Sequence, residues 1–442
     1  MVLRSPQFWL LASLISIAMV ALAAGCADAA TLREASVLRL PTPVQTVTPI
    51  PPPNAAASPA ANPTVFLVVT YFLPTPTPTA TATQTPTATT TPTTTPPSRT
   101  LAPAPEGIWI SAEELAALPM EGPAWYRLKA AADGWLGEPN MSGWTANHDV
   151  LTLAVALVYA RTADEHYQHK AAQAIRDTIG TEHTGLRKRS RPERGGLAVI
   201  VGRNLVSYII AADLIDLAGY DPRLNAQFRA WIQGLLHARW VDGSLVLEDE
   251  RPATTHGRMA GASRAAIAVY LGDEEELTRT AQVFKGFLGD RESYSDFIFQ
   301  ADRSWQANLY QPVGINPAGA ILGGYPIDGA LTEEMRRGCT FRFPPCHTGY
   351  PWEALQGTVV EANILHRQGF DVWNWEDKAI LRAVQFLYDL QQTYPETPWW
   401  AVEDDTWVPW LINGVYGTNF PTDPANIGKN MGWTDWTHGP VG

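Results

Sequence analysis

The sequence predicts an all-α fold in which paired antiparallel helices curl into an incomplete α/α toroid. From Asn147 to Tyr394, apolar residues recur at helical spacing in one segment after another, and alternating strand patterns are almost absent. The segments come in pairs, an apolar helix followed by a more charged one, as in two-layered helical arrays. An open solenoid would share this pattern, so closure into a toroid is an inference from the pairing.

The first two pairs precede residue 237. Asn147 begins a helix with apolar residues at helical spacing, and residues 166–179 form its amphipathic partner. A long apolar helix is expected at 197–217, followed by Gly219, and its partner at 222–236 begins with a proline. Gly219 and Pro222 are thus typical of the end of one helix and the start of the next.

Two further pairs follow. Residues 256–270 form an apolar helix rich in Ala, Gly and Ser, whose small side chains allow another helix to approach closely, and residues 274–288 form its partner. Residues 353–368 keep their apolar residues on one face and end before Gly369, which is a typical helix stop. The last partner is expected at 376–394.

Residues 1–25 are expected to form an export signal of the lipoprotein type. Arg4 precedes an apolar run from Phe8 to Ala24, and the small residues before Cys26 resemble a bacterial lipoprotein cleavage site, where the cysteine receives the lipid. An ordinary cleaved signal and an uncleaved membrane anchor are the alternatives.

Residues 26–105 are dominated by Pro, Thr and Ala. Such a composition cannot bury a core and favours extended segments, so we interpret it as a stalk that holds a domain at 106–442 away from the membrane. With the signal, it predicts an extracytoplasmic location, as a cell-surface lipoprotein or as a periplasmic or secreted protein.

Cysteine content and charge limit the partners. If Cys26 carries lipid, Cys339 and Cys346 are the only other thiols, so one disulfide across a short loop is expected, with two free thiols as the alternative. The net charge of −12 argues against nucleic acid and means that an anionic ligand needs a local cationic cleft. We expect no cofactor and no metal, because no His/Cys cluster has zinc-ligand spacing. The domain is expected to be a monomer.

The densest group of polar and aromatic residues runs from Asp328 to Trp375, and we expect it to contain a functional loop. Of the 17 tryptophans, only Trp9 lies outside the domain. Sugar rings stack on aromatic side chains, so this content favours a carbohydrate ligand, although tryptophans also fill cores and about half should do so here. The segment at 430–438 is aromatic as well and is expected to pack onto the domain.

Polar candidates for a site occur at predicted helix starts, inside one apolar helix and in the long loop. Each has a structural alternative, such as a helix cap for Asn147 or half of a buried ion pair for Arg203. Their joint occurrence favours a site. The candidates are Trp144, Asn147, His148, Arg203, His256, Arg336, Arg337, His347 and Tyr350.

Three stretches resemble the alginate-lyase-like superfamily of polysaccharide lyases. They are GRNLVSYIIAADLIDL, THGRMAGASRAAIAVYLGDEEEL and DGALTEEMRRG…YPWEAL…GFDVWNW, and the resemblance extends roughly over residues 144–394. It implies an α/α toroid and β-elimination of an anionic polysaccharide that contains uronic acid. In that reaction the sugar carboxylate is neutralised, a base removes the C5 proton, and an acid protonates the leaving oxygen.

The resemblance also implies residue roles. His256, Arg337 and Tyr350 match the catalytic histidine, arginine and tyrosine, and a tyrosine whose pKa is lowered by a nearby arginine can serve as both base and acid. Substrate binding is expected from Trp144, Asn147, His148, Arg203 and Trp352.

Two departures from the family pattern leave alternatives open. Thr254 and Thr255 stand where the family has asparagines, so Asn147 or Arg203 would have to neutralise the carboxylate, and the spacing from arginine to tyrosine is lengthened by the cysteine loop. One alternative is a non-catalytic glycan-binding lipoprotein. Another is a glycoside hydrolase on the same scaffold, whose acid and base would come from Asp328, Glu334, Glu353, Asp404 and Asp405.

Overall fold

The computed structural model describes Pro97 and residues 107–182, 191–240 and 243–439. The expected signal, the lipidated Cys26 and almost all of the stalk lie outside the described residues. The helical fold class is confirmed, because the described residues form helices joined by loops, with a single two-stranded hairpin.

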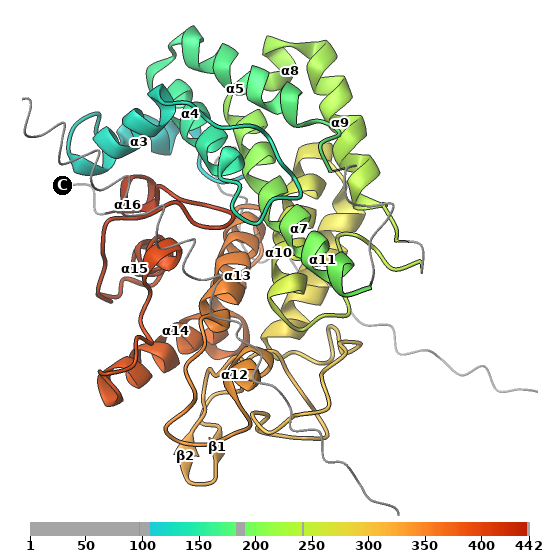
Figure 1. Ribbon diagram of the computed structural model, residues 1–442, viewed down its shortest axis with the longest axis vertical. Coiled ribbons are helices and arrows are strands. Elements are labelled where there is room, and N and C mark those ends of the chain that lie inside the picture. Colours follow the sequence, from blue (N-terminus) through green and yellow to red (C-terminus); the bar gives the residue numbers. More distant parts are fainter. Residues whose placement is uncertain (1–96, 98–106, 183–190, 241–242, 440–442) are drawn as a thin grey trace, which may run out of the picture. The chain divides into compact units, whose positions relative to one another are not determined.

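The elements follow one another along the chain as shown in Figure 1. The helices before the long central segment are α2 (Ala112–Ala117), α3 (Pro123–Asp133), α4 (His148–Thr162), α5 (Glu165–Thr178), α7 (Arg191–Leu214), α8 (Leu217–Tyr220), α9 (Pro222–Leu236), α10 (Thr255–Leu271) and α11 (Glu274–Leu288). After them come β1 (Ile321–Leu322), β2 (Tyr325–Pro326), α12 (Thr332–Gly338), α13 (Tyr350–Arg367), η1 (Val372–Asn374), α14 (Trp375–Thr393), η2 (Glu403–Asp405), α15 (Val408–Tyr416) and α16 (Thr434–Thr437).

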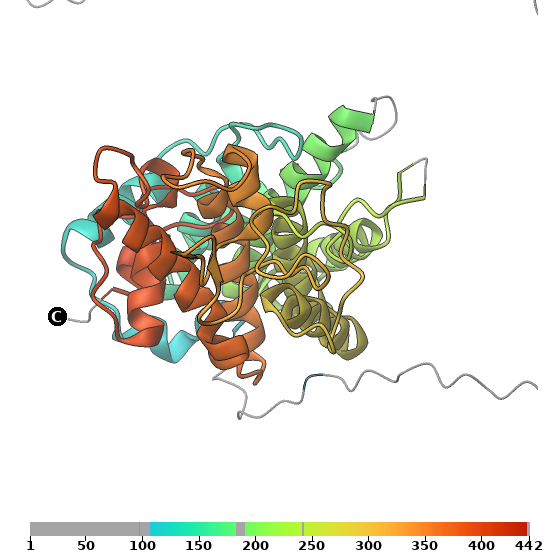
Figure 2. The ribbon, with the colours of Figure 1, turned by 90° about the horizontal axis from the view of Figure 1, so that it is seen from below.

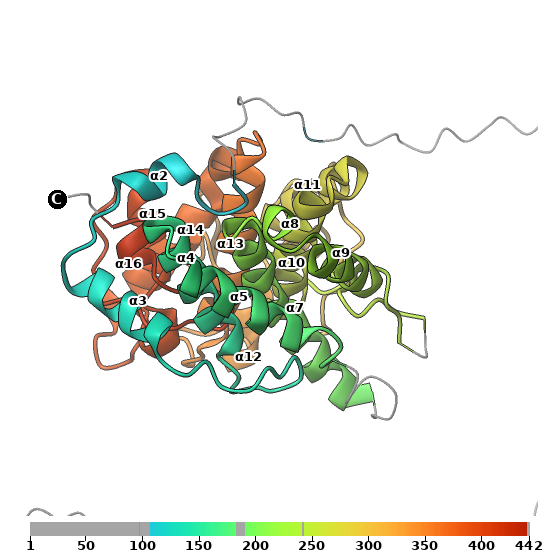
Figure 3. The same ribbon diagram turned by 90° about the horizontal axis from the view of Figure 1, so that it is seen from above.

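Four helices form an inner row. Helix α4 packs on α7, α7 packs on α10, and α10 packs on α13, while α3, α5, α9, α11 and α14 flank the row. Figure 3 shows α4, α7, α10 and α13 side by side with these helices around them. The inner helices are the apolar ones of each predicted pair, and α4 packs on α5, α10 on α11 and α13 on α14 as expected, whereas α9, the predicted partner of α7, packs on α8 and α10.

The contact between α10 and α13 is exceptionally close. A Cβ atom on Gly357 would lie 2.6 Å from the backbone carbon of Arg258, and one on Gly261 would lie 2.4 Å from the carboxylate of Glu361. At the same crossing Arg258 Nη1 donates to Glu361 Oε2 at 3.1 Å, and both side chains are fully buried. Helix glycines therefore let the two backbones meet around a buried ion pair.

The segment between α11 and α13 lies across one end of the helices (Figures 1 and 2). It is held by Trp305, whose indole packs on Phe341 and Phe343 and donates to the carbonyl of Cys339 at 2.9 Å. The sulfur atoms of Cys339 and Cys346 lie at disulfide distance, as expected.

One expectation for this segment was wrong, because the loop predicted from Asp328 contains a helix. Helix α12 carries Glu333 and Glu334 in its first turn and Arg336 and Arg337 in its last turn, so its charges complement the helix dipole. The helix is too short to show apolar periodicity, which explains why composition suggested a loop.

The segment at 430–438 packs onto the domain as expected. The indole of Trp433 donates to the Val150 carbonyl at 3.2 Å, and that of Trp436 donates to the Pro119 carbonyl at 2.8 Å. Both side chains are buried. The segment is therefore tied to α4 and to the loop before α3.

Substitution of Gly357 by Ala should destabilise the domain by about 2 kcal/mol, because the added methyl group would press against the α10 backbone. Chemical denaturation would measure the free energy of unfolding. Gly234→Ala is the matched control, since this helical glycine of α9 is exposed and a Cβ atom there would meet nothing within 4 Å. The control should stabilise the protein by up to about 1 kcal/mol, and equal effects would contradict the proposed close contact.

Candidate functional site

A cavity of about 160 Å³ lies at the N-terminal ends of α10 and α13. Its walls come from five parts of the chain that are far apart in sequence. The lining residues are Trp144, Val199, Arg203, Thr255, His256, Met259, Arg337, Tyr350, Glu353 and Lys429. The structure therefore brings together five predicted site residues, Trp144, Arg203, His256, Arg337 and Tyr350.

Arg203 supplies a buried cation to this cavity. It is only 4% exposed, and its guanidinium donates to the side-chain oxygen of Asn204 at 3.0 Å and to the carbonyl of Trp144. Its guanidinium carbon also lies 5.7 Å from the centre of the Trp144 ring. Within the described part of the chain, no carboxylate lies at ion-pair distance from Arg203. A buried arginine that has no carboxylate at ion-pair distance attracts an anionic ligand.

Asp149 is the acid whose charge would act most strongly on Arg203, but its environment disfavours the charged form. Both carboxyl oxygens are buried and have no hydrogen-bond partner among the described residues. Burial raises the pKa of Asp149 to about 8, although the charge of Arg203 acts in the opposite direction. The carboxyl group is therefore mostly protonated at neutral pH, and the charge of Arg203 remains available.

Glu334 connects two of the predicted catalytic residues. This buried side chain accepts hydrogen bonds from the backbone N–H of Thr255 at 2.6 Å and from its hydroxyl at 3.0 Å. Its other carboxyl oxygen accepts from Arg337 at 3.3 Å. Glu334 therefore caps α10 from another helix and holds both His256 and Arg337 at the cavity.

Arg337 lies directly over the ring of Tyr350. The guanidinium carbon is 3.1 Å from the ring centre, a cation–π contact that fixes the tyrosine side chain. Tyr350 begins α13 and is about one-third exposed, so its hydroxyl can reach a ligand. The longer spacing between these residues in the sequence has not separated them in space.

Burial, helped by the charge of Arg337, keeps the imidazole of His256 neutral. Burial lowers the pKa of His256, the charge of Arg337 lowers it further, and Glu353 opposes both. Since the ordinary pKa is already near 6.5, the ring is uncharged at neutral pH and can accept a proton.

Lys429 is a site residue that the sequence did not indicate. Its ammonium group contacts Glu353 at 3.2 Å and Asp404 at 2.8 Å. Burial alone would lower the pKa of Lys429, but its hydrogen bond to Asp404 and the nearby carboxylates raise it overall. Glu353 and Asp404 were expected as hydrolase candidates, and the one sequence signal for Lys429 is its position directly before the aromatic segment at 430–438.

Three predicted binding residues lie away from this cavity. The expectation that His148 binds substrate is corrected, because its ring is buried in the core and lies 2.7 Å from the Tyr208 hydroxyl, and burial lowers its pKa to about 4. Asn147 precedes α4 and is exposed, so it does not take the role of a missing asparagine. Trp352 is almost fully buried, donates to the Trp399 carbonyl at 2.9 Å and lines the neighbouring cavity instead.

The remaining loop candidates have structural partners. Arg336 is paired with Glu333 at 2.9 Å, and the Nε2 atom of His347 lies 3.0 Å from the Pro398 carbonyl oxygen. Ten of the sixteen domain tryptophans are buried, so packing explains most of them.

Among the described residues, there is no group of three or more His, Cys, Asp and Glu side chains that could hold a metal. None of the described helices combines the length and apolarity needed to span a membrane.

The pKa of His256 should respond in opposite directions to two neutralising substitutions. Arg337→Gln removes a positive charge, so the pKa should rise, and Glu353→Gln removes a negative charge, so it should fall. A pH titration of the His256 ring protons by NMR, assigned with His256→Gln, would measure both shifts. Arg336→Gln is the control, because that side chain does not line the cavity. Shifts in the same direction would contradict the arrangement described.

The cavity therefore combines cationic side chains, a neutral imidazole and a phenol hydroxyl, which suits it to hold an anion and to move a proton. Comparison with known proteins adds no assignment. A scan against models of known protein families finds no match to the chain, and neither does a search of curated proteins.

Proposed function

We propose that this protein cleaves a uronic-acid-containing polysaccharide by β-elimination. The observation that carries the proposal is the position of Arg203, a buried cation without a carboxylate partner among the described residues, in one cavity with His256 and Tyr350. A buried cation without an ion-pair partner favours an anionic group, and a neutral imidazole beside it favours removal of a proton from the same ligand.

Each residue would have a distinct role. Arg203 would hold the carboxylate of the sugar acid and stabilise the charge that develops when the C5 proton leaves. His256 would take that proton, and Tyr350 would donate its hydroxyl proton to the O4 atom. The C5–H and C4–O bonds break, a double bond forms between C4 and C5, and no water is consumed. Arg337 would keep Tyr350 in place.

The inner and outer helix layers are compatible with an incomplete toroid, which we propose as the architecture. The order of contacts from α4 through α7 and α10 to α13 supports a curved inner wall. The cavity would then lie at one mouth of the toroid. The signal and stalk would keep this mouth outside the cytoplasm, tethered through Cys26 to a membrane, where polysaccharides are accessible.

One observation favours a glycoside hydrolase as the second candidate. Burial raises the pKa of Asp405 to about 7, and the charge of Asp404 acts in the same direction, so Asp405 has the properties of a general acid. Its carboxylate accepts from Gln356 at 2.7 Å and lines the neighbouring cavity. Glu353 and Asp404, however, both pair with Lys429, so neither is a free carboxylate that could act as the base or nucleophile beside Asp405.

His256→Ala and Arg337→Ala should each lower the elimination rate about a hundredfold or more, because the first removes the proposed base and the second removes the contact that positions Tyr350. The unsaturated sugar end that elimination creates absorbs ultraviolet light, so its formation can be followed directly. Alginate, glucuronan, pectin and glycosaminoglycans are the substrates to test.

Controls separate catalysis from folding and from hydrolysis. His169→Ala and Arg336→Ala replace side chains outside the cavity and should leave the rate unchanged, and thermal unfolding followed by circular dichroism should be similar for all variants. Full activity in both site variants would refute the site. New reducing ends without ultraviolet absorbance, lost in Asp405→Asn, would instead identify a hydrolase.

A further inference from the structure

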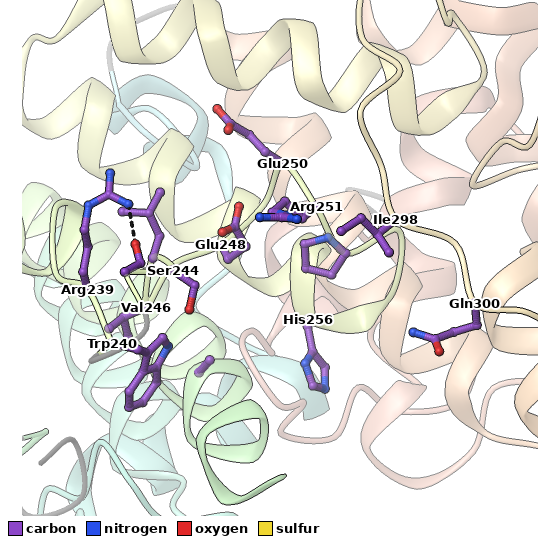
Figure 4. A pocket seen from close by; sticks show the side chains of 14 residues that line it. Arg239, Trp240, Ser244, Val246, Glu248, Glu250, Arg251, His256, Ile298 and Gln300 are labelled. Atoms are coloured by element: carbon purple, nitrogen blue, oxygen red, sulfur yellow. Dashed lines mark hydrogen bonds between the residues drawn. The ribbon is translucent and has the colours of Figure 1, made fainter. Parts of the chain in front are cut away.

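The cavity is the centre of a longer groove. His256 also lines a cavity of about 1060 Å³, which we call the Trp240 arm, and Figure 4 shows His256 at its edge. Tyr350, Glu353 and Lys429 also line a third cavity of about 450 Å³, which we call the Trp400 arm. Because these lining residues are shared, a polymer bound at the centre would extend into both arms.

The Trp400 arm carries an excess of negative charge. Four carboxylate side chains line it, and one lysine, Lys429, is shared between two of them. The exposed Glu403 has no ion pair within the described part of the chain. The four acidic residues are Glu353, Glu403, Asp404 and Asp405. A second sugar carboxylate placed in this arm would therefore be repelled.

An aromatic wall makes the same arm suitable for an uncharged sugar. The ring of Trp400 is half-buried, with Trp352 and Tyr388 each packed edge-on at 5.3 Å between ring centres. Its indole N–H donates to the Pro421 carbonyl at 3.1 Å, which fixes the ring plane. A rigid aromatic ring offers apolar surface to a sugar face without requiring charge.

The Trp240 arm has the opposite balance. Arg239 and Arg251 line it, and among the described residues neither has a carboxylate at ion-pair distance. Of the two acids in its wall, Glu250 is already paired with Arg279 at 2.8 Å, which leaves Glu248. This arm is also more than twice as large as the other, so it can receive several sugars, including a further acidic one.

We propose that the substrate is a copolymer in which a hexuronic acid alternates with an uncharged sugar, and that the Trp400 arm binds the uncharged sugar next to the cleaved bond. The inference rests on the proposed elimination at the central cavity. A homopolymer of uronic acid would place a carboxylate against Glu403 and Asp404, whereas the alternating polymer places none there.

The test compares two polymers that both contain glucuronic acid and differ in whether an uncharged sugar separates one glucuronic acid from the next. Unsulfated chondroitin alternates glucuronic acid with an N-acetylated hexosamine, whereas glucuronan consists of glucuronic acid alone. The full chain should eliminate from chondroitin at least about tenfold faster than from glucuronan, because one unfavourable charge contact separates them. Glu403→Gln should raise the ratio of the glucuronan rate to the chondroitin rate about threefold or more, and Glu396→Gln, an exposed acid outside the groove, should not change it.

The outcomes distinguish this inference from the proposed function. Equal elimination from both polymers, with a ratio that Glu403→Gln does not change, would overturn the inference and leave the lyase proposal standing. If neither polymer yields an unsaturated product, the elimination proposal fails for these substrates, and the affinity of the full chain for each polymer decides the inference. Tighter binding of chondroitin than of glucuronan, with a smaller difference in affinity in Glu403→Gln, would support the inference. Equal binding of the two polymers, or no binding, would overturn it.

Discussion

The backbone contact between α10 and α13 is the constraint on which the candidate site depends. The contacts Arg258–Gly357 and Gly261–Glu361 run in the same direction along both helices, so their N-terminal ends lie at the same end of the domain. His256 and Tyr350 occupy these ends. Small residues at the crossing thus set the distance between two functional groups several residues away, and a larger side chain at the crossing would displace both.

A second constraint is electrostatic. Glu334 takes the place of a local side-chain cap for α10 and is also the partner of Arg337, so one buried carboxyl group orients two walls of the cavity. Thr255 is suited to this arrangement, because its hydroxyl provides a second donor to the same oxygen. Thr255 therefore supports the start of α10, and under the proposed function Arg203 is the residue that attracts the anion.

The sequence was most informative where periodicity was strong. The predicted helices at 222–236 and 274–288 coincide with α9 and α11. Both helices are amphipathic, and the capping residues in their sequences mark where they begin and end. By contrast, α4 is buried on nearly all sides, so no apolar face indicated that His148 points into the core. Lys429 could not be found because its partners, Glu353 and Asp404, are brought to it only by the tertiary fold.

Lys429 also has a consequence for how the site is assembled. The backbone N–H of Lys429 is held by the side chain of Gln356 at 2.8 Å, and the carbonyl of the next residue accepts from Ser207 at 2.7 Å, so this segment joins α13 to α7. Lys429 follows all four inner helices in the chain. During synthesis those helices emerge before Lys429, so a chain that has not yet reached this residue lacks part of the cavity wall. Activity would then begin only after this late segment has docked.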